Sequence, residues 1–334
     1  MKSPRWVVAV GASAGGIEAL RDFFAQVPRD VDAAFLVVMH IPAHSPSQLH
    51  QVLAGCTSLE VCAASDKERL KTGYVYVARA DLHLMTEGDV IRLTRGPKEC
   101  RARPSVDVLL RSVAVSHGPR AVGIVLSGML DDGTAGLWAI KDAGGAALVQ
   151  DPAEALYPSM PQSAIDHVDV DVVAPVAELA RAVARIAAEP EPSSMASASP
   201  VQASENEVAN EGNALELGVL KMGEVSRYTC PDCHRVLVQI REGAILRFRC
   251  HTGHAFSLLT LLAEVGESID KGLWDTIRAI EERLLLLRQL QELSDKAGRT
   301  KEAREYDALA HETEVRIQPL RDLALDAQLF ARQR

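Results

Sequence analysis

Three short apolar runs, rich in β-branched residues, constrain the fold of this chain more than any other feature. They are WVVAVG (6–11), AAFLVVMH (33–40) and AVGIVLSG (121–128), and each ends at a glycine or a polar residue. A helix-compatible run, IEALRDFFAQV (17–27), follows the first of them. Continuous apolar strands that alternate with helices are typical of a parallel sheet covered on both faces. The first part of the chain is therefore predicted to be α/β.

A change of composition divides the 334-residue chain. Residues 189–216 hold Pro, Ser, Ala, Glu and Asn and almost no large apolar side chain, so they cannot bury enough surface to offset the entropy lost on ordering. We predict a first domain over 1–188, a flexible linker over 189–216, a Cys/His-rich module over 217–256 and a helical hairpin over 257–334.

The overall charge and hydropathy exclude several classes of protein. The net charge is −9 and the pI about 5.6, which argues against a nucleic-acid or anionic-membrane binder, because both favour a basic face. No apolar run reaches the ~20 residues of a membrane span, and too few apolar residues precede the first glycines for a signal peptide. We expect a cytoplasmic protein.

The first predicted strand leads directly into GASAGG (11–16) and then into a helix. A G-x-S-x-G pattern between a strand and a helix is typical of a nucleophilic serine, because small neighbours allow a sharp turn that exposes the hydroxyl. Two alternatives are open: Ser13 could cap the helix, or the glycines could form a dinucleotide-binding loop. That loop expects an acidic residue at the end of the second strand, where this sequence has His40.

A hydroxyl, an imidazole and a carboxylate fall at the ends of three predicted strands. Ser13 follows the first strand, His40 ends the second, and Asp131 and Asp132 follow the third. The carboxyl ends of neighbouring parallel strands meet in one crevice, so we expect a Ser-His-Asp triad there. Taken singly, each residue has a structural alternative as a hydrogen-bonded histidine or a turn or cap residue. The pattern alone does not separate Asp131 from Asp132.

Four motifs resemble the catalytic domain of the chemotaxis receptor methylesterases, the CheB type. They are GASAGGIEAL (11–20), VVMHIP (37–42), RPSVDVLLRSVA (103–114) and VLSGMLDDGTAGL (125–137). The resemblance implies a doubly wound, mostly parallel sheet. It also implies a serine hydrolase that needs no catalytic cofactor and removes methyl esters from glutamates of chemoreceptor-like signalling proteins, often with deamidation of glutamines.

Carried over by position, the resemblance assigns Ser13 as the nucleophile, His40 as the base and Asp132 as the orienting carboxylate. Asp132 is preferred because the family usually has an asparagine at the preceding position. The first domain, 1–188, is accordingly identified as a methylesterase catalytic domain.

The resemblance also implies residues around the triad. The backbone N–H groups of Ala14 and Met129 become candidate oxyanion donors, and Arg103 and Ser105 border the substrate cleft, although Arg103 could equally be a surface ion-pair residue. Ala14 stands where the family usually has threonine. Leu130 stands where it usually has glycine and is expected to narrow the cleft. No receiver domain precedes this domain in the sequence, so we expect no regulation by aspartyl phosphate in the same chain.

The Cys/His-rich module has the ligand spacing of a metal site. Cys230 and Cys233 form one pair, and Cys250 and His254 follow about 16 residues later. Two such pairs can close a tetrahedral site, so we predict a structural zinc ion on these four residues in a zinc-ribbon-like module. His251 or His234 could replace His254. The intervening VLVQIREGAILRFR (236–249) is predicted to be a hairpin that turns at Glu242-Gly243. A redox C-x-x-C is the disfavoured alternative.

The last part is predicted to be two helices. Apolar residues recur every three or four positions from Leu262 to Leu287, SDKAGRT (294–300) is turn-like, and a weaker stripe continues from Lys301 to Arg332. The apolar stripe needs a partner, which is either the second helix or another subunit. In the second case the chain would be a homo-oligomer. We hypothesise that linker, module and hairpin serve targeting or dimerisation.

The leading function is protein-glutamate methylesterase, with a methylated chemoreceptor or similar signalling protein as the partner. The alternative is a non-catalytic relative in which this fold binds a partner and the zinc and helical parts do the signalling. A nucleotide-binding oxidoreductase is a third hypothesis, opposed by His40.

Overall fold

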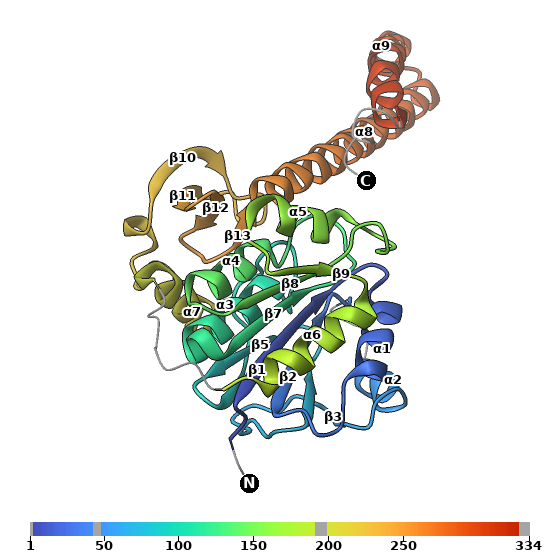
Figure 1. Cartoon of the computed structure of the whole chain (residues 1–334). Helices are drawn as coiled ribbons and strands as arrows, with labels where there is room; N and C mark the ends of the chain where they lie inside the picture. The colour runs from blue at the N-terminus through green and yellow to red at the C-terminus, as the bar shows by residue number, and fades with distance from the viewer. Residues whose placement is uncertain (1–2, 43–47, 191–198, 327–334) are drawn as a thin grey trace. The chain divides into compact units, whose positions relative to one another are not determined.

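The computed structural model describes residues 3–42, 48–190 and 199–326 (Figure 1). It divides into two compact units, Met1–Thr260 and Leu261–Arg334. The first unit is built on a seven-stranded sheet whose neighbouring strands all pair in parallel. In spatial order the strands are β3 (Glu60–Ala63), β4 (Tyr74–Val77), β2 (Ala33–Met39), β1 (Trp6–Ala12), β7 (Ala121–Val125), β8 (Ala146–Gln150) and β9 (Val172–Ala174).

Helices cover both faces of this sheet. Every residue of β1, β2 and β7 is buried, because side chains on both faces of these strands pack under helices. One core lies between the sheet and α1 (Gly16–Gln26), α2 (Leu49–Ala54) and α6 (Val176–Ala188). The other lies under α3 (Val106–His117), α4 (Thr134–Asp142) and α5 (Ser159–His167). The prediction of a mostly parallel α/β sheet is confirmed.

The order of the strands creates a crevice at the centre of the sheet. The chain runs from β1 outward through β2 to β3 and β4, and later returns to place β7 on the other side of β1. In open α/β sheets, ligands bind beyond the carboxyl ends of the strands at such a switch point. Ser13, His40 and Asp132 follow β1, β2 and β7, so all three residues lie at this edge.

Smaller elements complete the first unit. An antiparallel pair, β5 (His83–Glu87) and β6 (Val90–Thr94), lies between β4 and α3 in the sequence, and a 3-10 turn, η1 (Gly118–Arg120), precedes β7. A second 3-10 turn, η2 (Val219–Lys221), leads into a four-stranded antiparallel sheet. Its strands are β10 (Glu224–Thr229), β11 (Val236–Glu242), β12 (Ile245–Cys250) and β13 (Ala255–Ser257).

The structure contains the hairpin predicted over 236–249, but the turn lies one residue later than predicted, at Gly243 and Ala244, because Glu242 is the last residue of β11. Strands β11 and β12 pair antiparallel from Leu237↔Cys250 to Glu242↔Ile245. Gly243 occupies the turn with φ 58°, a conformation in which glycine has no steric cost. The hairpin thus brings Cys250 back beside the start of β11.

The prediction of a flexible linker over 189–216 is wrong for residues 200–211, which form helix α7 (Pro200–Glu211). Residues 191–198 of that segment lie outside the described part of the chain. Residues 200–211 contain few large apolar side chains, and α7 is held instead by a helix cap, small buried residues and ion pairs. Ser199 caps its first turn, Val208 and Ala209 are fully buried, and Glu205 forms ion pairs with arginines of β12.

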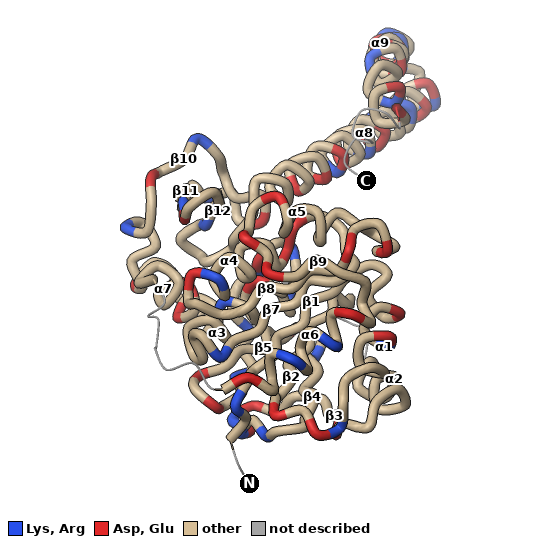
Figure 2. Tube along the Cα trace, in the orientation of Figure 1, with Lys and Arg blue, Asp and Glu red and all other residues tan. Residues whose placement is uncertain are grey.

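The second unit consists of two long helices, α8 (Leu258–Lys296, whose first turn belongs to the first unit) and α9 (Thr300–Leu325). Ion pairs Glu281–Arg321 and Arg288–Glu314 join them in antiparallel order. Figure 2 shows charges of both signs along both helices. Residues 327–334, the end of the predicted second helix, lie outside the described range. None of the helices within the described residues is long and apolar enough to cross a membrane.

Candidate active site

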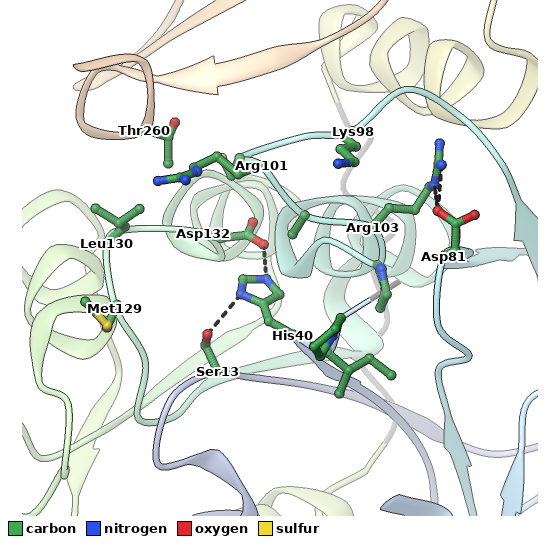
Figure 3. Close-up of a pocket in the computed structure, with 15 residues that line it drawn as sticks. Ser13, His40, Asp81, Lys98, Arg101, Arg103, Met129, Leu130, Asp132 and Thr260 are labelled. Carbon is green, nitrogen blue, oxygen red and sulfur yellow. Dashed lines mark hydrogen bonds and ion pairs between the residues drawn. The ribbon is translucent and has the colours of Figure 1, made fainter. Parts of the chain in front are cut away.

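Ser13, His40 and Asp132 form one hydrogen-bonded line (Figure 3). The His40 Nδ1 lies 3.0 Å from the Ser13 Oγ, and the His40 Nε2 lies 2.7 Å from Asp132 Oδ2. A carboxylate at Nε2 favours the tautomer that carries its proton there, which leaves Nδ1 free to accept the serine proton. In this orientation the imidazole can accept the proton of the Ser13 hydroxyl.

The backbone around Ser13 is fixed by the neighbouring strand ends. The Ser13 N–H donates to the Ser127 carbonyl at 2.9 Å, and the His40 N–H donates to the Ala12 carbonyl at 3.1 Å. Close packing requires glycine nearby: a Cβ on Gly128 would lie 2.9 Å from the Ser13 Cβ and 2.0 Å from the Met160 Sδ. The contacts with Ser13 and Met160 thus explain the glycine at position 128 in the loop after β7.

Asp132 is held by the start of helix α3. Its carboxylate accepts the backbone N–H groups of Val106 (2.8 Å) and Asp107 (2.9 Å) and the Ser105 hydroxyl (2.9 Å). The N-terminus of a helix favours a negative charge, since its N–H groups and dipole point at the anion. Asp132, rather than Asp131, is therefore the carboxylate that is fixed against His40.

Asp107 is a residue of this site that the sequence analysis did not single out. It is buried, and its Oδ1 accepts the N–H groups of Gly133 (2.9 Å) and Gly136 (2.7 Å) at the start of α4. Burial, together with the charge of Asp132, raises the pKa of Asp107 to about 8. Its signal in the sequence was an acidic residue in the first turn of α3, two positions after Ser105.

A cleft of about 420 Å³ opens over the triad. Its lining combines strand ends with two loops, residues 98–104 and 129–132, and one residue from α8; the lining residues are Ser13, His40, Ile41, Pro42, Asp81, Lys98, Cys100, Arg101, Ala102, Arg103, Pro104, Met129, Leu130, Asp132 and Thr260. Leu130 lines the cleft with φ 61°. Its isobutyl group occupies a position at which glycine would leave space.

The structure places the two predicted cleft residues, Arg103 and Ser105, differently. Arg103 lines the cleft, and its guanidinium donates hydrogen bonds to Asp81 at 2.6 and 2.9 Å. The prediction that Ser105 borders the cleft is wrong. Its side chain is fully buried because its hydroxyl donates to Asp132 from behind.

The two candidate oxyanion donors have free backbone hydrogens within the described residues. Neither the Ala14 N–H nor the Met129 N–H has an acceptor within hydrogen-bond distance among residues 3–42, 48–190 and 199–326. Ala14 directly follows Ser13, and Met129 lines the cleft beside it (Figure 3). Unpaired N–H groups beside a nucleophile are the groups that can stabilise a developing oxyanion.

The four predicted metal ligands come together in the antiparallel sheet. The Sγ atoms of Cys230, Cys233 and Cys250 and an imidazole nitrogen of His254 all lie within 4.8 Å of one another. The Cys233 and Cys250 sulfurs are 3.6 Å apart, close to the ~3.8 Å between thiolates on one tetrahedral zinc ion. The donor set therefore fits a structural zinc ion. His234 and His251, the two alternatives, are not part of this cluster.

The first part of the chain is similar to known proteins. The sequence model of the CheB methylesterase family matches residues 8–183. A protein-glutamate methylesterase/protein-glutamine glutaminase of Rhizobium johnstonii is 38% identical over 186 residues, 54% of this chain and 51% of the relative. A putative protein-glutamate methylesterase/protein-glutamine glutaminase of Leptospira interrogans is 34% identical over 180 residues, 54% of this chain and 93% of the relative.

The crystal structure of the Thermotoga maritima CheB methylesterase catalytic domain is similar in fold. It matches with a TM-score of 0.52 and 28% identity over all of that chain and 56% of this one. The chain spans about half the length of the Rhizobium relative and of a Geobacter metallireducens relative, at 51% and 49%.

Proposed function

This chain belongs to the CheB methylesterase family, and we propose on that basis that it hydrolyses methyl esters of glutamate side chains in chemoreceptor-like signalling proteins. The hydrogen-bonded line from Ser13 through His40 to Asp132, in an open cleft, is the observation that supports this activity most. The names of the relatives also support deamidation of glutamine side chains at the same site.

The geometry supports an acyl-enzyme route. The His40 Nδ1 accepts the Ser13 proton while the Oγ attacks the ester carbonyl carbon, and Asp132 stabilises the imidazolium. The N–H groups of Ala14 and Met129 receive the oxyanion. Methanol leaves with the proton from Nδ1. Water then attacks the acyl carbon while Nδ1 accepts its proton, and the Ser13 Oγ leaves with that proton, which releases the glutamate.

We also propose that a structural zinc ion is held by Cys230, Cys233, Cys250 and His254, in a zinc-ribbon-like module. Zinc with four protein ligands supplies folding energy and leaves no open position for catalysis. The esterase step is therefore assigned to the triad alone. The antiparallel order of α8 and α9 supports the helical hairpin, and its role in forming homo-oligomers stays a prediction.

The test is release of labelled methanol from carboxyl-methylated chemoreceptor membranes by the full chain. We expect the Ser13→Ala variant to release methanol about 10³-fold or more slowly than the wild type, as removal of a triad nucleophile does. Ser58→Ala, the same substitution at an exposed position outside the cleft, should retain wild-type activity. If the wild type releases no methanol, labelling of Ser13 by a fluorophosphonate distinguishes an esterase with another substrate from a non-catalytic relative, which would leave Ser13 unlabelled.

A further inference from the structure

The two loops that wall the cleft have backbone conformations that need external support. Cys100 and Arg101 in the first loop have φ 48° and 70°, and Leu130 in the second has φ 61°. Residues with a side chain rarely occupy this left-handed region unless surrounding contacts hold them there. Each loop has contacts to residues beyond 183, where the family match ends, in addition to contacts such as Ser159 with the Leu130 carbonyl.

Strand β13 holds the first loop by its backbone. The Ala255 N–H donates to the Lys98 carbonyl at 3.2 Å, and the Cys100 N–H donates to the Ala255 carbonyl at 2.9 Å. Glu99, between them, forms a parallel bridge with Ala255. The loop that carries Lys98 and Arg101 into the cleft is thus paired to the edge of the antiparallel sheet.

Buried ion pairs hold the same loop by its side chain. The carboxylate of Glu99, 2% exposed, accepts from Arg111 of α3 at 2.9 Å and from Arg249 of β12 at 2.7 Å. Arg249 also donates to Glu205 of α7 at 3.1 Å and to the Gly253 carbonyl at 2.8 Å. Breaking a buried charge pair leaves an uncompensated charge, so these contacts resist displacement of the loop.

A hydroxyl pair at the start of α8 holds the second loop. The Ser257 Oγ donates to Asp131 Oδ1 at 2.7 Å, next to the triad carboxylate. The Ser257 N–H and the Thr260 Oγ1 are joined at 2.8 Å, which fixes the turn. Thr260 itself lines the cleft, where it lies near Arg101 and Leu130 (Figure 3).

We propose that Arg249 and Ser257 are positioning residues of the esterase cleft, and that Thr260 forms part of its substrate-facing wall. Arg249 acts through Glu99 on loop 98–104, and Ser257 acts through Asp131 on loop 129–132. The inference rests on the proposed esterase function. Neither residue bonds to Ser13 or His40, so loosening these ties leaves the reacting groups in place. A protein substrate must then order the loops itself, which weakens its binding.

The first test compares Ser257→Ala with Ser226→Ala in the full chain. Ser226 is in the same sheet, but its hydroxyl bonds with the nearby Tyr228 backbone. With a methylated protein substrate, we expect Ser257→Ala to raise KM about five- to tenfold, the ratio that one hydrogen bond supplies, with kcat within about twofold. Ser226→Ala should keep the wild-type KM. Equal KM values for both variants and the wild type would overturn the role of Ser257.

The second test reads the loop position without any esterase assay. Cys100 lies in the first loop, 7% exposed, and burial raises the pKa of its thiol, so it should alkylate slowly. We expect Arg249→Met to raise the alkylation rate of Cys100 about tenfold or more relative to Cys56 of the same chain, measured by peptide mass spectrometry. Arg241→Met, at an exposed position of β11, is the matched control.

Arg249→Lys keeps the charge and should give an intermediate rate, because one ammonium cannot reproduce the forked contacts of the guanidinium. If Arg249→Met does not fold, the Cys100 rate in Arg249→Lys decides the question. Wild-type Cys100 rates in folded Arg249 variants would overturn the role of Arg249. If the wild type lacks esterase activity while Cys100 becomes reactive in these variants, the proposed function fails and the structural tie stands.

Discussion

Asp107 and Asp132 each accept hydrogen bonds from the helix start beside the other. The Asp107 N–H donates to Asp132 at 2.9 Å, and Asp107 accepts from Gly133, the residue after Asp132, at 2.9 Å. This exchange joins the starts of α3 and α4 to the loop that carries the triad carboxylate. The orientation of His40 therefore depends on two helices, α3 and α4, that contain no member of the triad.

Replacement of Asp107 by alanine or by asparagine should give different results. Alanine leaves the buried N–H groups of Gly133 and Gly136 without an acceptor, and each costs about 1–3 kcal/mol of unfolding free energy. Asparagine keeps the acceptor and resembles the neutral carboxyl that a pKa of about 8 implies at pH 7. Urea unfolding at pH 7 should show Asp107→Asn near wild type and Asp107→Ala well below it. Equal losses would contradict the capping role.

Asp132→Asn should abolish most activity with little effect on expression. The carboxylate oxygen that faces both the Val106 N–H and the His40 Nε2–H would become an NH2 group, or the imidazole would have to adopt its other tautomer. In that tautomer Nδ1 carries the proton and cannot accept the proton of Ser13. We expect a loss of about 10⁴-fold in kcat, the effect of the same change in serine proteases. Methanol-release kinetics measure it, and a loss under tenfold would rule out this orientation of the ring.

Gly11→Ala should displace the first turn of α3. A Cβ on Gly11 would lie 2.0 Å from Val106 Cγ1, and the Val106 N–H is one of the donors that hold Asp132. Overpacking of this kind costs about 1–3 kcal/mol. The double variant Gly11→Ala/Val106→Ala removes the clash and should recover part of the kcat that the single variant loses. Gly55→Ala, whose nearest added contact is 3.5 Å, serves as the control.

Asp131→Asn should make the protein more stable above pH 6. Burial raises the pKa of Asp131 from 3.8 to about 6 in the folded state. The unfolded chain therefore ionises first, and the unfolding free energy of the wild type falls as the pH rises from about 4 to about 6. Asparagine cannot ionise, so the unfolding free energy of the variant relative to that of the wild type should rise by on the order of 2–3 kcal/mol across this pH window. Urea unfolding at pH 4, 6 and 8 tests it, with the exposed Asp30→Asn as the control.

Removal of zinc should unfold the antiparallel sheet that carries the Cys/His cluster. We expect about one zinc ion per chain by atomic emission, and loss of that ion in Cys233→Ser, because three ligands hold zinc far less tightly than four. Cys62→Ser, at a cysteine in β3 of the parallel sheet, should keep the metal. A purified wild-type chain without zinc, whose Tm does not change with added zinc, would contradict the assignment.

The parallel sheet and the convergence of Ser13, His40 and Asp132 could be predicted from the sequence. The reason is that continuous apolar strands and the residues directly after them determine both features. Helix α7 could not be predicted from its composition, because its stability comes from charged partners far away in the sequence. Glu205 is unremarkable until Arg247 and Arg249 are placed against it.

The same limit applies to details of the site. Ser105 lies in a family motif, and the sequence does not show that its hydroxyl points at the back of Asp132 rather than into the cleft. The contact of Ser257 with Asp131 joins residues 126 positions apart, and no local sequence pattern predicts it.

The cleft is built from residues far apart in the sequence, and this has a consequence for how the protein is made. During translation, Ser13 and His40 emerge early, their carboxylate follows about ninety residues later, and the threonine that completes the wall of the cleft comes last, at position 260. A chain released prematurely would carry the nucleophile and the base without the parts that orient and enclose them. A chain that stops before residue 132 therefore lacks the carboxylate that orients His40, and one that stops before residue 260 lacks Thr260 in the wall of the cleft.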